Sequence, residues 1–260
     1  RSSCVGRAAA ALAAAALLLA LLLRLVRSSV APFLFVIFSH NLCDGNYNTV
    51  WRIFKDNLEW LRETLKFIKT LDLDINWIVK EHPSDYGSAR ISTSTLKEFQ
   101  NIIGFKENIK LFPKNFDTSL VKELASCVLT SQGSAGLEYP CFGIPSIIAG
   151  DSHYQGIGFT IEPKTKKEYF QQISSIRNII SKGLDEQQID LARINYCILE
   201  ELGKIDHPLL YNYDISRKFN LDEFFKKLTE LLSEYNEKDD LFKKNLIRQL
   251  DEKNRFLINI

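Results

Sequence analysis

Apolar runs alternate with polar segments between residues 33 and 150, and this alternation predicts buried strands. The runs span residues 33–38, 75–79, 109–112, 127–130 and 145–149. Short, mostly apolar runs bounded by polar residues are typical of strands covered on both faces of a sheet. We therefore expect five strands in this part of the chain.

Helical patterns fill the segments between these runs. Apolar residues recur at helical spacing from Val50 to Ile68, and shorter helices are expected over 94–103, 118–126 and from the Gly/Ser-rich turn through Phe142. Strands that alternate with helices predict an α/β fold with a Rossmann-like, doubly wound parallel sheet. Beyond Thr165 the pattern is helical only, over 166–180, 185–202 and 221–250.

The first thirty residues differ from the rest of the chain. Residues 8 to 23 are all Ala or Leu, and four arginines with no acidic residue surround them. There are three alternatives: a membrane anchor, a signal peptide and a sequence with no native role. The apolar run is short for a membrane span. Arg24 and Arg27, directly after the run, suit a signal peptide poorly. We expect three segments: 1–30, non-native or anchor-like; 31–215, a Rossmann-like domain; and 216–260, charged amphipathic helices.

Composition excludes several classes of protein. The chain has 260 residues, 45% of them hydrophobic, and a net charge of +1, which gives no support for nucleic-acid binding by a basic surface. Five cysteines without a C-x-x-C pair exclude a disulfide framework and a cysteine zinc site, and favour a reducing, cytoplasmic location. The chain begins with Arg1 and contains no Met, so we expect a fragment whose start lies upstream.

Polar segments follow the predicted strands, and the carboxyl ends of parallel strands meet at one edge of a sheet. Lys80 and His82, which precede Pro83, offer donors suited to phosphate. In the turn 131–138, Gly133 allows close backbone approach, Ser134 is a good N-cap, and the helix N-terminus suits a phosphate. Glu138, one turn further on, could accept ribose hydroxyls or serve only as a capping acid.

Two further segments offer weaker candidates. His40 and Asp44 lie in the first loop, where substrate contact and plain loop polarity are equally plausible readings. In the loop 150–158, Asp151 could bind a hydroxyl and Tyr154 could stack on a base or sugar. A Ser-His-Asp hydrolase is disfavoured because G-x-S-x-G is absent, and nothing in the sequence demands a metal.

Taken together, five segments give the chain a family resemblance over about residues 33 to 180. They are Phe54–Leu61, Trp77–Pro83, Ser131–Glu138, Cys141–Pro145 and Tyr154–Thr160. This set resembles the bacterial capsule and surface-polysaccharide biosynthesis proteins, which are similar to GT-B glycosyltransferases such as the Kdo and sialic acid transferases. Gln132 stands where those relatives often have His.

The resemblance implies a GT-B C-terminal, donor-binding domain that uses a nucleotide sugar as its substrate, without a metal or other cofactor. It places the donor phosphate on His82, Gly133 and Ser134, with help from Lys80, and the ribose on Glu138; we also assign Ser131 to this binding set. It implies a polysaccharide or lipid-linked glycan acceptor, reached at the cytoplasmic face of the inner membrane. The catalytic base is expected on an acceptor domain outside this fragment, so the catalytic residues stay unknown.

Two other functions compete with a glycosyltransferase. A sugar-nucleotide epimerase would need acid/base carboxylates near the sugar, for which Asp44 and Asp151 are the candidates. A non-enzymatic assembly protein would use the C-terminal helices for docking. Acceptor-dependent transfer, epimerisation of the sugar, or neither reaction would separate the three.

Overall fold

The computed structural model describes residues 33–42, 53–71, 75–85, 93–113, 117–202, 209 and 220–252. The chain divides into two compact units, Arg1–Arg193 and Ile194–Ile260. The expected segment 1–30 lies outside the described residues, as does the expected boundary at 215/216, which stays a prediction. No helix in the described ranges is long and apolar enough to cross a membrane.

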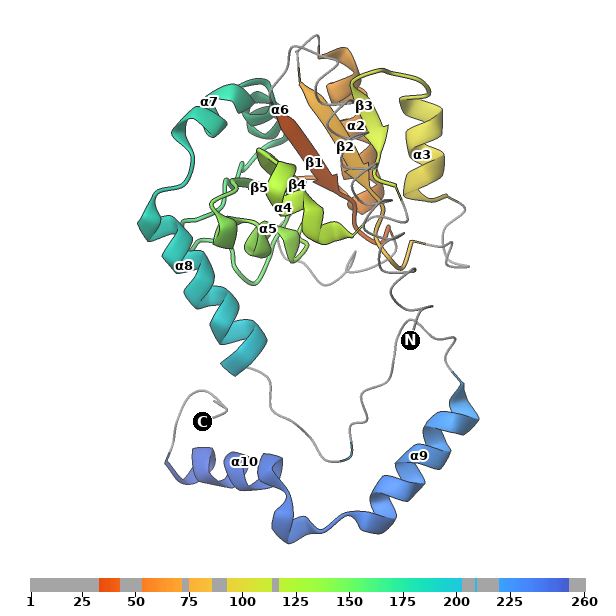
Figure 1. Ribbon diagram of the computed structural model, residues 1–260, viewed down its shortest axis with the longest axis vertical. Helices are drawn as coiled ribbons and strands as arrows, with labels where there is room; N and C mark the ends of the chain where they lie inside the picture. The colour runs from red at the N-terminus through yellow and green to blue at the C-terminus, as the bar shows by residue number, and fades with distance from the viewer. Residues whose placement is uncertain are drawn as a thin grey trace, which may run out of the picture. The chain divides into compact units, whose positions relative to one another are not determined.

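The first unit contains a five-stranded sheet with the order β3-β2-β1-β4-β5, and every pair of neighbouring strands is parallel (Figure 1). The strands are β1 (Leu34–Phe38), β2 (Asn76–Lys80), β3 (Ile109–Leu111), β4 (Cys127–Thr130) and β5 (Ser146–Ile148). The chain builds outward from β1 to β3, then returns to the other side of β1 for β4 and β5. This reversal is the topological switch of a doubly wound sheet, so the predicted fold class is confirmed.

Helices cover both faces of the sheet because alternate residues of each strand point to opposite sides. On one face, Phe35 and Ile37 of β1 lie in a core cluster with residues of α2, α3, α6 and α7. On the other face, Leu34 and Val36 pack with residues of α4, α5 and the segment that follows α5. Among the described residues of the first unit, the helices are α2 (Asn57–Thr70), α3 (Thr95–Ile102), α4 (Val121–Leu124), α5 (Ala135–Glu138), α6 (Lys166–Ser174) and α7 (Ile176–Lys182). The next helix, α8 (Glu186–Cys197), includes the boundary between the two units.

Capping side chains decide where several helices begin. Asp56 accepts a hydrogen bond from Glu59 N at the start of α2, and Thr165 accepts one from Glu168 N at the start of α6. Each bond satisfies a backbone N–H that has no partner inside its helix. As a result α2 begins at Asn57, later than the apolar spacing from Val50 predicted.

Three predicted helices are interrupted. The helix expected through Phe142 consists of four α-helical residues, α5, and a 3-10 turn at Pro140–Phe142. The helix expected over 166–180 is broken at Ser175, between α6 and α7. The helix predicted over 185–202 is α-helical only as far as Cys197 and continues as a π-helix over Ile198–Leu202.

The second unit contains α9 (Leu221–Glu234) and α10 (Leu241–Asp251), so one continuous helix over 221–250 is wrong. The break follows from capping residues inside the predicted span. Asn236 accepts a bond from Lys238 N, and Asp240 accepts one from Lys243 N, which starts a new helix. Such side chains compete with the helical backbone and favour a restart.

The central strand gives the first prediction. Ile37 is fully buried in β1, so Ile37→Ala should lower the free energy of unfolding by about 2–5 kcal/mol through lost burial and a residual cavity. Phe105→Ala is the control, because Phe105 is 90% exposed and its loss should cost less than about 1 kcal/mol. Urea unfolding measures the free energy of unfolding of both variants. Equal decreases in the two variants would contradict this account of the core.

Candidate functional site

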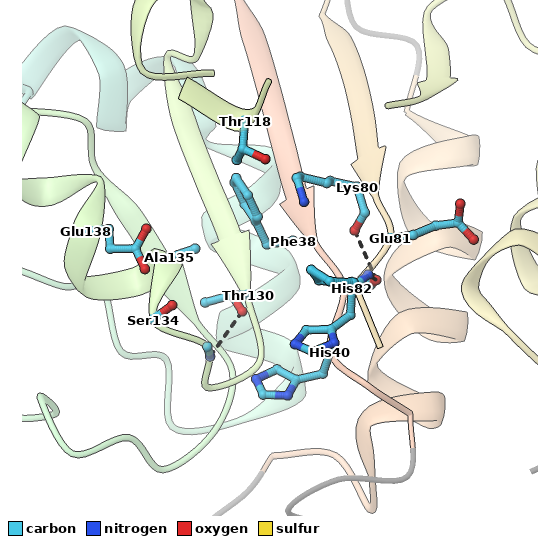
Figure 2. Close-up of a pocket in the computed structure, with 13 residues that line it drawn as sticks. Phe38, His40, Lys80, Glu81, His82, Thr118, Thr130, Ser134, Ala135 and Glu138 are labelled. Carbon is cyan, nitrogen blue, oxygen red and sulfur yellow. Dashed lines mark hydrogen bonds between the residues drawn. The ribbon is translucent and has the colours of Figure 1, made fainter. Parts of the chain in front are cut away.

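A pocket of about 380 Å³ opens at the carboxyl ends of β1, β2 and β4, where the strand order reverses. Open α/β sheets bind their ligands at such switch points. Figure 2 shows its side chains converging from the three strand ends and the turn after β4. The lining residues are Phe38, Ser39, His40, Lys80, Glu81, His82, Pro83, Thr118, Thr130, Gly133, Ser134, Ala135 and Glu138.

The strand register places these ends level with one another. Phe38 of β1 is paired with Lys80 of β2 on one side and with Thr130 of β4 on the other. The residues that follow each strand therefore enter the same space. The candidate segments that follow β1, β2 and β4 supply lining residues, whereas the loop 150–158 after β5 supplies none.

Lys80 brings a positive charge into this space. Its ammonium group lies 5.8 Å from the ring centres of both Phe38 and Phe112, and burial lowers its pKa, an effect that the negative charge of Glu138 partly offsets. Within the described part of the chain, its Nζ has no hydrogen-bond or ion-pair partner. A half-buried cation whose donors are unused gains from any anion that enters the pocket.

His82 is held in a defined orientation beside Lys80. Its Nδ1 accepts a hydrogen bond of 3.1 Å from Ser84 N, so in the neutral ring the proton sits on Nε2. Its backbone N–H donates to Ser39 Oγ at 3.1 Å, and its carbonyl accepts from Asp85 N. The bond from Ser84 N therefore sets both the tautomer and the orientation of the ring.

Ser39 ties the ends of β1 and β2 together. The hydroxyl of this buried serine donates to Lys80 O at 3.0 Å, while it accepts from His82 N and, at 3.0 Å, from Thr95 Oγ1 of α3. Asp85, also buried, accepts from Thr95 N at 2.7 Å and closes the turn after Pro83. This network fixes the backbone on both sides of Glu81.

His40 and Gly133 meet across the mouth of the pocket. The imidazole of His40 lies parallel to that of His82, with ring centres 6.3 Å apart. A Cβ at Gly133 would lie 3.0 Å from Thr130 Oγ1 and 3.3 Å from His40 Nε2, so a side chain there would crowd both groups. The glycine allows the turn after β4 to approach His40 closely.

Ser134 and Glu138 line the opposite wall (Figure 2). Ser134 stands at the N-cap of α5, but its side chain makes no capping bond, so that expectation is wrong and the hydroxyl is exposed instead. Because α5 has only four residues, the expected phosphate site at a helix N-terminus has no support.

The other predicted binding residues lie elsewhere. Ser131 is buried and outside the pocket lining, and half-buried Asp151 is also outside it. Tyr154 is fully buried and donates its hydroxyl proton to Gly133 O, so it lies behind the turn and cannot stack on a ligand in this pocket. Asp44 lies outside the described residues.

Sequence reasoning missed several lining residues. Phe38 and Thr130 are the last residues of β1 and β4, and Thr118 begins a 3-10 turn after β3. The parallel register was the available signal for Phe38 and Thr130. Glu81 also lines the pocket, yet its side chain points away from Lys80 and Glu138 (Figure 2). No group of three His, Cys, Asp or Glu side chains within the described ranges is placed to hold a metal.

No family model and no curated protein matches the chain. Among solved structures it is similar to the UDP-bound MnaA of S. aureus (14% identity, TM-score 0.42, covering 68% of this chain and 48% of that one). It is also similar to the UDP-GlcNAc 2-epimerase of Neisseria meningitidis bound to UDP-GlcNAc (13%, TM-score 0.40, 66% and 42%).

A third similar structure is the glycosyltransferase of kitacinnamycin (13% identity, TM-score 0.36, covering 63% of this chain and 38% of that one). The chain thus spans less than half the length of each of these three proteins. Likenesses at this level decide nothing about function, which has to be argued from the pocket itself.

The Ser39 network gives the second prediction. Ser39→Ala should lower the free energy of unfolding by about 1–3 kcal/mol, because it leaves buried partners without their hydrogen bonds. Ser181→Ala removes an exposed hydroxyl that bonds only within α7 and should cost less than about 0.5 kcal/mol. If the two variants unfold at the same urea concentration, the network does not hold the strand ends.

Proposed function

We propose that this pocket binds the phosphate of a nucleotide-activated sugar, and that the chain is the donor-binding part of a metal-independent, GT-B-type glycosyltransferase. The observation that carries the proposal is the half-buried ammonium of Lys80, which faces the pocket without a hydrogen-bond partner in the described part of the chain. Phosphate oxygens would supply the missing partner and offset the cost of burying the charge.

The neighbouring groups suit the same ligand. His82 would donate its Nε2 proton to the phosphate, because Nδ1 accepts from Ser84 N. Ser134 adds an exposed hydroxyl on the opposite wall. A diphosphate bridging these groups would have donors on both sides. The carboxylate of Glu138, on the same wall of the pocket as Ser134, would accept hydrogen bonds from the two ribose hydroxyls.

These groups would act on the step in which the donor loses its nucleotide. The bond between the anomeric carbon and the phosphate oxygen breaks, the acceptor oxygen bonds to that carbon, and the electron pair goes to the departing phosphate. Lys80 and His82 would stabilise this growing charge, which is the main electrostatic task of the step. The acceptor's proton would pass to a base contributed by a part of the protein outside this pocket.

The biological setting follows from the family resemblance of the sequence. The acceptor would be a polysaccharide or a lipid-linked glycan in bacterial capsule or surface-polysaccharide synthesis. Transfer would take place at the cytoplasmic face of the inner membrane.

A sugar-nucleotide epimerase is the second candidate, and the pair of parallel imidazoles favours it. His40 and His82 would give the pocket two imidazoles that could act as general acid and general base. The carboxylate candidates for this chemistry lack comparable support, because Asp151 lies outside the pocket lining and Asp44 outside the described residues. Release of free nucleotide only when an acceptor is present would favour transfer over epimerisation.

The third prediction tests the phosphate site. His82→Ala should weaken CMP or UDP binding about 10- to 100-fold, because a hydrogen bond to a charged group contributes about 1.5–3 kcal/mol. His153→Ala is the matched control, since His153 is exposed and outside the pocket lining. Calorimetric titration measures the affinity of wild type and of both variants, and a thermal melt checks that each is folded. Equal affinities for wild type and His82→Ala, or a folded wild type that binds neither nucleotide, would overturn the proposal.

The fourth prediction tests the ribose assignment. Glu138→Gln should weaken a ribonucleotide more than its 2′-deoxy analogue, since the 2′-hydroxyl is one of the two proposed partners of the carboxylate. The ratio of the two dissociation constants, measured by titration for wild type and variant, isolates this effect from any general loss. An unchanged ratio would mean that Glu138 does not contact the 2′-hydroxyl.

A further inference from the structure

Tyr154 joins the loop after β5 to the turn after β4. Its side chain is fully buried, and its hydroxyl donates to the carbonyl oxygen of Gly133. Gly133 lines the pocket and Tyr154 does not. Tyr154, which does not line the pocket, thus hydrogen-bonds to the backbone of Gly133, which does.

The space that the tyrosine occupies exists only because residue 136 is glycine. A Cβ at Gly136 would lie 2.1 Å from the Tyr154 hydroxyl oxygen and 2.8 Å from its ring carbon Cζ. On another side, the ring of Phe159 is inclined by 27° to the tyrosine ring, with ring centres 6.1 Å apart. Packing therefore fixes the position from which the hydroxyl reaches Gly133.

Hydrogen bonds to both the N–H and the carbonyl of Gly133 hold the turn. Its N–H donates to Thr130 Oγ1 at 3.2 Å, and its carbonyl accepts from Gly136 N at 3.0 Å as well as from Tyr154. Burial raises the pKa of Tyr154, so its hydroxyl stays a donor through neutral pH. The Gly133 carbonyl belongs to the same peptide unit as the nitrogen of Ser134, whose hydroxyl is exposed at the pocket.

We propose that Tyr154 is a positioning residue, which orients the peptide between Gly133 and Ser134 so that the Ser134 hydroxyl meets the ligand's phosphate. The contact between Ser134 and a phosphate rests on the proposed function, whereas the anchoring of the turn by Tyr154 does not. Ligand binding and loop order can therefore be tested separately.

Tyr154→Phe in the full chain removes the hydroxyl and keeps the ring. Tyr169→Phe is the matched control: Tyr169 is equally buried, its hydroxyl accepts from Trp60 Nε1 at 2.9 Å and bonds to Thr64, and it lies outside the pocket lining. Hydrogen exchange without ligand should speed up over 131–136 in Tyr154→Phe only. Unchanged exchange there, or the same increase in Tyr169→Phe, would overturn the anchoring role.

Titration with UDP tests the functional half. Losing one neutral hydrogen bond should weaken UDP about 3- to 10-fold in Tyr154→Phe and leave Tyr169→Phe within about 2-fold of wild type. Because Tyr154 is proposed to act through Ser134, its effect should nearly vanish in a Ser134→Ala background and persist in a His82→Ala background. A merely structural loss would be the same in both backgrounds.

The outcomes separate the two proposals. If wild type binds no UDP, the proposed function fails, whereas the exchange result still decides whether Tyr154 anchors the turn. If exchange rises and UDP affinity does not change, or if the effect is additive with Ser134→Ala, the positioning role is refuted although nucleotide binding stands.

Discussion

The structure of the first unit depends on the parallel pairing of β1 with β2 on one side and β4 on the other. A slip of one residue in either pair would turn every buried side chain of a strand to the opposite face. Because Phe35 and Ile37 pack in one core cluster and Leu34 and Val36 in the other, burial on both faces fixes the register. The same register sets Phe38, Lys80 and Thr130 level, so the core determines where the pocket forms.

The pocket combines this fixed frame with a charge that costs stability. Half-burying the Lys80 ammonium is unfavourable in the unliganded protein, and the lowered pKa of Lys80 reflects that cost. Hydrogen bonds among Ser39, Thr95 and Asp85, in which the Asp85 carboxylate accepts from Thr95 N, hold the backbone around it. This network fixes the strand end that carries Lys80, and the rings of Phe38 and Phe112 lie beside its ammonium group.

Much of the fold follows from the sequence, because strand identity depends on short-range patterns. The run at 33–38 and the alternation of strands and helices predict the parallel sheet, and the parallel rule brings His82 and Ser134 to one edge. Tertiary effects decide the rest. Tyr154 stands in a polar, Gly-rich loop that indicates exposure, yet the gap left by Gly136 buries it. The break near Asn236 and Asp240 depends on capping bonds, which apolar periodicity does not show.

The most direct test of the account is an experimental structure of the protein with bound UDP. The account predicts the diphosphate at the carboxyl ends of β1, β2 and β4, with phosphate oxygens within hydrogen-bond distance of Lys80 Nζ and His82 Nε2 and the ribose beside Glu138. UDP bound at another place on the first unit, with this pocket empty, would contradict it.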